Sequence, residues 1–151
     1  MKLLFKINLA LLALFAIGIA VTARISHDLL QRNARDEVIE QAKLLIDSAL
    51  AVRSYTSTNI APLLETQIKY EFRPEMVSAY SAIALLRNLR EPNPEYKQFL
   101  YREATLNPTN PANRAVEWES DIVQAFRNGA AQTSLVGERD TPNGRMLYVA
   151  K

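Results

Sequence analysis

The sequence contains no cysteine among its 151 residues, and this absence removes several kinds of chemistry. Without thiols, these residues form no disulfide, bind no metal through thiolate, provide no cysteine nucleophile and attach no cofactor through a thioether. Histidine is almost as scarce, because the single copy is His27, beside Asp28. One imidazole without a thiol supplies neither a catalytic triad nor a zinc site, so we interpret His27 as a solvated side chain.

Glycine and charge of one sign are also in short supply. The four glycines are not clustered, which excludes a glycine-rich phosphate loop. Lys plus Arg is 18 and Asp plus Glu is 16, and this balance argues against a nucleic-acid binder, which concentrates basic residues on one face. Glu117 and Asp121 would share a helix face, and we interpret them as solvated charges rather than a cation site. We predict no enzyme.

A membrane signal occupies the N-terminus, residues 1–23. Lys2 and Lys6 precede an uncharged run from Ile7 to Ala23. As a helix the run spans about 26 Å, close to a hydrocarbon core of about 30 Å, and flanking Lys6 and Arg24 can reach the interfaces. We predict a retained transmembrane anchor with its N-terminus inside the cell. The alternative is a cleaved secretory signal that ends at Val21-Thr22-Ala23.

A long amphipathic helix is predicted for residues 24–55, which contain neither glycine nor proline. Its apolar residues recur at intervals of four and three, as on one face of a helix. They are Ala34, Val38, Ala42, Leu45, Ala49 and Val52. We expect this stripe to pack on the chain's own domain, residues 56–151. The alternative is a homodimer formed through this helix, for which the many alanines are less well suited.

Further helices are expected in the remaining domain. Pro62 should end or kink the long helix, and Pro74 suits the first turn of a second helix that runs from Glu75 to about Asn88. Val77, Tyr80, Ile83 and Ala84 are expected to face inward. A third helix is predicted from about Ala112 to Asn128, followed by Gly129 in the left-handed C′ conformation.

Three short strands complete the prediction. They are Tyr96–Ala104, Leu135–Arg139 and Arg145–Ala150. Asp140 to Gly144 should turn the chain between the last two, since Asn-Gly is a strong hairpin signal. Asn107 to Asn113 carries two Asn-Pro steps and is predicted to be a stiff, extended connector. The fold class is α+β with an antiparallel sheet, which we expect to be incomplete because three short strands bury little area.

Several aromatic residues fall on predicted inward positions. Ordinary core packing explains each of them, but three could instead line a pocket for a flat ligand. These three candidate site residues are Tyr55, Tyr80 and Tyr101.

Several blocks of the sequence resemble the Tll0287-like domain family, from about Ala34 onward. The most specific block is Tyr101 to Ala115, which reads Tyr-Arg-Glu-Ala-Thr-Leu-Asn-Pro-Thr-Asn-Pro-Ala-Asn-Arg-Ala. Weaker blocks occur in the family's order. They are Ser48 to Thr56, Ile60 to Leu64, Ser78 to Ala82, Trp118-Glu119, Phe126-Arg127, Gly137 to Arg139 and Leu147 to Ala150.

The resemblance implies a PAS-like, extracytoplasmic sensor domain held at a bacterial inner membrane by one N-terminal anchor. Its implied partners are the membrane and a signalling module downstream, in the same chain or another. Many family members carry a Cys-x-x-Cys-His motif that attaches haem c. No cofactor can attach within these residues, so we expect haem c only if the complete protein continues into that motif, and we expect this chain to stop before it. The alternatives are an anchored electron-transfer cytochrome and a haem-free small-molecule binding module.

Overall fold

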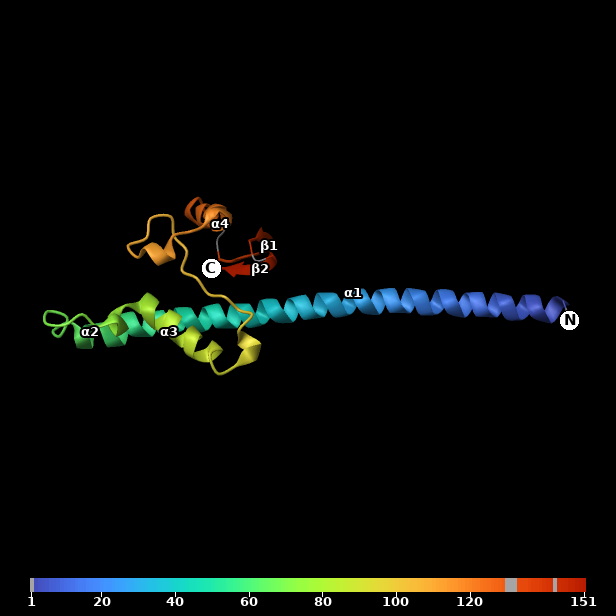
Figure 1. Cartoon of the computed structure of the whole chain (residues 1–151), viewed down its shortest axis with the longest axis horizontal. Helices are drawn as coiled ribbons and strands as arrows, with labels where there is room; N and C mark the ends of the chain where they lie inside the picture. Colours follow the sequence, from blue (N-terminus) through green and yellow to red (C-terminus); the bar gives the residue numbers. More distant parts are fainter. Residues whose placement is uncertain (1, 130–132, 143) are drawn as a thin grey trace. The chain divides into compact units, whose positions relative to one another are not determined.

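In a computed structural model, the chain is rich in helix and ends in a hairpin (Figure 1). Residues 2–129, 133–142 and 144–151 are described. The chain divides into two compact units, Met1–Glu40 and Gln41–Lys151. The predicted α+β class is confirmed, with a two-stranded antiparallel sheet among the described residues.

The first unit consists of the N-terminal part of helix α1, Lys2–Tyr55. From Leu3 to Leu30 its large apolar side chains are exposed, for example Phe5 at 70%, Leu12 at 68% and Ile19 at 69%, whereas Ile39 near its end is buried. By length and composition the helix can cross a membrane, although a signal sequence would pass the same test. His27 is exposed on this helix, as expected.

The long helix does not end at Pro62. After Tyr55 it passes through a π-helical segment, Thr56–Ile60, and continues as α2, Ala61–Leu64. Pro62 lies in the first turn of α2, where its missing N–H is tolerated. A widened turn therefore precedes Pro62, where the sequence predicted an end or a kink of the helix.

The second unit has a small apolar core between α1 and helix α3, Ser78–Arg90. Ala49, Ala82 and Leu86 are buried, and three partly buried residues pack against them. These three are Leu45, Leu89 and Tyr101. The predicted stripe of α1 is therefore confirmed from Ala42 to Val52, whereas Ala34 and Val38 are exposed.

The inward face predicted for α3 is wrong. Val77, Tyr80 and Ile83 are 42%, 39% and 39% exposed, and Ala84 is half-buried. Pro74 begins a separate 3₁₀ turn, Pro74–Met76, so α3 starts only at Ser78. Ala82 of α3 is instead buried in the same cluster as Ala49 of α1. Two small side chains allow the helices to approach more closely than bulky ones would.

The strand predicted for Tyr96–Ala104 is also absent from this described segment. Pro94–Tyr96 forms a 3₁₀ turn, and residues 97–104 are irregular. The alternation of side chains is real, but an extended segment becomes a strand only when a neighbouring backbone pairs with it. Here the one bridge comes later, between Thr105 and Arg114.

The Asn-Pro block is a closed loop rather than an extended connector. The N–H of Thr105 donates to the carbonyl of Asn113 at 2.9 Å, and the N–H of Ala115 donates to the carbonyl of Thr105 at 2.9 Å. Within the loop, Pro111 begins the 3₁₀ turn Pro111–Asn113, and Asn110 Oδ1 accepts the N–H of Ala112. The prolines stiffen the loop, and backbone hydrogen bonds join its two ends.

Helix α4, Glu117–Arg127, is shorter than the predicted third helix because this 3₁₀ turn precedes it. Ile122 is buried, and Trp118 and Phe126 on the same face are half-buried. Gly129 follows with a φ of +71°, which confirms the predicted left-handed position.

The C-terminal hairpin is confirmed. Strand β1, Leu135–Thr141, pairs antiparallel with β2, Gly144–Ala150, and Leu135 lies opposite Ala150. The turn was predicted on Asp140 to Gly144, but Asn143 lies outside the described residues. Gly144 has a φ of +108°, a conformation that favours glycine.

Candidate functional site

The most highly connected polar feature is the segment Tyr101–Glu103, which we call the strap. In extended backbone, successive side chains point to opposite sides. Accordingly, Tyr101 and Glu103 contact one another and α1, whereas Arg102 contacts α4. The strap thereby ties together two helices that are far apart in sequence.

On the α1 side, Glu103 is the centre of a three-residue cluster. One carboxylate oxygen, Oε2, lies 3.1 Å from Arg53 Nη1, and the other, Oε1, accepts the Tyr101 hydroxyl at 3.0 Å. The Glu103 side chain is only 11% exposed, whereas that of Arg53 is 39% exposed. Because Glu103 is sheltered and has two partners, the cluster fixes the end of α1 against the strap.

The Tyr101 hydroxyl is held in its protonated form. The pKa of Tyr101 is raised to about 12, mainly by burial and next by the neighbouring Glu103 carboxylate, while Arg53 acts in the opposite direction. The hydroxyl therefore acts as a hydrogen-bond donor at neutral pH rather than as a base or nucleophile.

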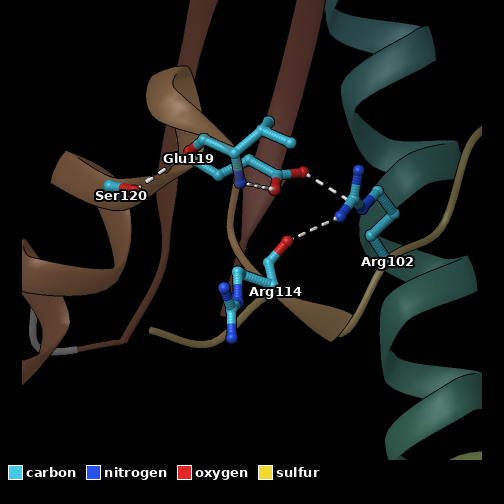
Figure 2. Close-up of polar contacts among 5 residues, drawn as sticks. Arg102, Arg114, Glu119 and Ser120 are labelled. Atoms are coloured by element: carbon cyan, nitrogen blue, oxygen red, sulfur yellow. Dashed lines mark hydrogen bonds and ion pairs between the residues drawn. The ribbon is translucent and has the colours of Figure 1, made fainter. Parts of the chain in front are cut away.

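On the α4 side, Arg102 reaches two acceptors, which Figure 2 shows. Its Nε lies 3.3 Å from Oε1 of Glu119, and its Nη2 donates to the carbonyl of Arg114 at 3.0 Å. The remaining Glu119 oxygen, Oε2, accepts the N–H of Val116 at 2.9 Å and so caps the start of α4. Glu119 is 6% exposed, so the ion pair and the cap together account for its burial.

A sequence profile of the Tll0287-like family matches residues 31–151. The chain belongs to the Tll0287-like family. No curated protein and no solved structure matches it. The resemblance found on the residues is therefore confirmed for the family, and the match begins inside α1 and includes the whole strap.

The three tyrosines predicted to line a pocket in this Tll0287-like domain are not alike. Tyr101 packs against the apolar core and belongs to the strap. Tyr55 is 59% exposed at the end of α1, and Tyr80 is 39% exposed on α3. The pocket itself stays a prediction.

Sequence reasoning missed the charged role of Glu103 and its partner Arg53, and it missed Glu119 as the partner of Arg102. Tyr101-Arg102-Glu103 stood out only as part of the family block, and alternation of a tyrosine and a glutamate around an arginine does not reveal their partners. Arg53 and Glu103 are distant in sequence, so only the folding of the second unit, to which both belong, brings them together.

The residues of this domain do not fit a covalently bound haem. The sequence supplies no cysteine for a thioether, and its single histidine, His27, is exposed on α1. Among the described residues, no group of three or more His, Asp or Glu side chains is placed to hold a metal ion. The strap is instead a mechanical connection between helices, and no redox step follows from it.

Proposed function

We propose that this Tll0287-like chain is a membrane-anchored sensor domain outside the cytoplasm of a bacterium, and that α1 carries its signal. The observation that supports this most is the strap. It ties the last turns of α1 to the start of α4 through Arg53–Glu103 and Arg102–Glu119. The domain is not proposed to be an enzyme.

The proposed mechanism is a shift between two packings of the domain on α1. A ligand that favours one arrangement of the strap changes the contacts of Glu103 with Arg53, and it shifts the population toward that arrangement. Only its difference in affinity for the two arrangements can drive the shift. The core between α1 and α3 is small, with three buried residues, Ala49, Ala82 and Leu86, so few contacts oppose such a shift.

Location is the first part to test. Alkaline phosphatase and β-galactosidase can be fused after Lys151 in separate strains, with a tag on the N-terminus. We expect active phosphatase, inactive galactosidase and a full-length tagged protein in the membrane fraction. A tag lost from the mature protein would indicate a cleaved signal, and active galactosidase would place the domain in the cytoplasm and contradict the proposal.

The nature of the signal is the second part. The complete reading frame that contains these residues should be expressed with the cytochrome c maturation system, and its visible spectrum recorded. Haem c bands would support a redox or gas sensor, or an anchored electron-transfer cytochrome. Their absence would favour the haem-free binding module.

Sensing and electron transfer are then separated by hydrogen exchange. For a haem-containing protein, exchange of Gln41–Tyr55 is compared after ferricyanide and after dithionite treatment. A sensor should show at least about threefold different exchange in this part of α1, and Arg53→Met should abolish the difference. The exposed Arg139, exchanged to Met, serves as the control and should leave it intact. Equal exchange in both redox states would contradict the redox-sensor version.

A further inference from the structure

The π-helical segment Thr56–Ile60 is a second unusual feature, independent of the strap. At its end the N–H of Ala61 bonds to the carbonyl of Thr56, five residues back rather than four. A π turn holds one more residue than the α turn it replaces, and such turns inside helices are often found at functional positions. The helix therefore carries one surplus residue between α1 and α2.

Two neighbouring side chains explain why the surplus lies here. In a regular α-helix the ring of Pro62 would clash with the carbonyl of Thr58, four residues earlier, and Pro62 offers no N–H to bond. Widening the turn relieves this clash. The Asn59 amide also donates to the carbonyl of Tyr55 at 3.4 Å, which satisfies a backbone acceptor that the wide turn leaves weakly bonded.

Packing holds the helix on both sides of the wide turn. Before it, Ala49 is fully buried against α3. At the turn itself Thr56 is 3% exposed, and the π segment contacts α3 and the Pro74–Met76 turn. The side chains of Ser57, Thr58 and Asn59 are exposed. The surplus residue thus lies between a stretch of α1 that packs on α3 and a wide turn that contacts both α3 and Pro74–Met76.

We propose that Thr56–Ile60 is a register hinge, defined as a wide turn that opens locally and lets α1 shift against α2 while both stay helical. Interconversion of a π turn with an α turn changes the axial position by about 1.5 Å and the orientation by about 100° per residue. This inference concerns the helix itself and stands whether or not the domain senses a ligand.

Single-residue deletions test the surplus. Deleting Ser57 together with Pro62→Ala should convert the segment to continuous α-helix and leave the thermal midpoint within about 3 °C of the wild type, because both packed faces keep their register. Deleting Ala51, an equally small and exposed residue inside α1, should lower it by more than about 10 °C, since everything after it turns by about 100°. Equal losses from both deletions would overturn the proposal.

Hydrogen exchange tests the opening. In the wild type, amides of residues 57–63 should exchange at least about tenfold faster than those of residues 45–55. The chain-length-preserving variant Pro62→Ala should slow this exchange, because it restores a backbone donor and removes the clash. Wild-type amides that exchange as slowly in the π segment as in α1 would also overturn the proposal.

Discussion

The two parts of α1 differ in the exposure of their apolar residues. From Leu3 to Leu30, leucines and isoleucines such as Leu12 and Ile19 are exposed, and they lie all around the helix. From Gln41 onward one face of the helix is buried or half-buried, with Ala49 completely buried, whereas Leu44 and Leu50 on other faces stay exposed. A helix that is apolar all round needs an apolar solvent, whereas an amphipathic helix finds its apolar surroundings within the protein. The first part therefore has the length and composition of a membrane span or a signal sequence, and the second part contributes to a protein core.

The largest expected effect concerns the exposed apolar run in the first part of α1. Leu12→Arg with Leu14→Arg places two charges near the middle of the apolar run, at a cost of about 5–7 kcal/mol for insertion into a bilayer. We expect the protein to leave the membrane fraction, as measured by fractionation and carbonate extraction. Leu12→Ala with Leu14→Ala is the control and should stay membrane-bound; loss of the alanine variant as well would mean that the effect is not one of charge.

The next effect concerns the buried cluster between α1 and α3. Leu86→Ala removes the largest side chain of the buried cluster and leaves a cavity, which should lower the free energy of unfolding by about 2–5 kcal/mol. Leu12→Ala, the same change in the exposed part of α1, should alter it by less than about 0.5 kcal/mol. Urea titration followed by circular dichroism of the detergent-solubilised protein measures both. Equal losses of stability for the two variants would contradict the distinction between the exposed apolar run and the buried cluster.

A smaller effect distinguishes sheltered from exposed charge pairs within the second unit. Glu119→Gln weakens the pair with Arg102 at a side chain that is 7% exposed, and we expect a loss of about 1–2 kcal/mol. Asp121→Asn removes the pair with Arg139, where both side chains are at least 40% exposed, and should cost less than about 1 kcal/mol. The same urea titrations give both losses of stability. A larger loss for Asp121→Asn would contradict the expectation that the sheltered pair contributes more than the exposed one.

The smallest effect concerns Tyr101 and appears only at high pH. Its pKa is raised from 10.0 to about 12 in the folded protein, so the folded state keeps the proton longer than the unfolded state does. This contribution to stability is complete below pH 10 and is lost as pH rises from 10 to 12. The thermal midpoint of the wild type should therefore fall more steeply over this range than that of Tyr101→Phe.

Absorbance at 295 nm provides an independent measurement of the same group. One tyrosine should titrate late in the wild type, and this step should be missing in Tyr101→Phe. Tyr70, which is 92% exposed, provides the control, since Tyr70→Phe should leave the late step in place. A late step that survives Tyr101→Phe would show that another tyrosine is responsible.

Local signals in the sequence predicted those parts of the fold that depend on neighbours along the chain. The stripe from Ala42 to Val52, the left-handed Gly129 and the C-terminal hairpin were all predicted, because periodicity and turn chemistry act over a few residues. The inward face of α3 was wrong, since a 3₁₀ turn at Pro74 delayed the start of the helix. The strand at Tyr96–Ala104 was wrong because alternation was taken as proof of a neighbouring strand.

The candidate site was predicted less well than the fold. Tyr101 was named, but as a pocket residue rather than as a member of a charged cluster. Its partners Glu103 and Arg53 carry no spacing signal, because ion pairs across a fold depend on distances in space. Similarly, the Asn-Pro block was recognised as stiff, but only the bond between Thr105 and Asn113 shows that its ends meet.

The sequence by itself determined the apolar run, the length of the helix after it, the hairpin, the family and the absence of thiol chemistry. Each of these follows from composition, from periodicity or from short motifs, which need no knowledge of distant contacts. Only the tertiary structure shows that Ala49 and Ala82 are buried in one cluster. It alone decided the ion pairs Arg53–Glu103 and Arg102–Glu119. It also decided that the helix widens into a π turn before Pro62. The physical reason is that side chains compete for partners only once the chain is folded, and the closest packing decides which pairs form.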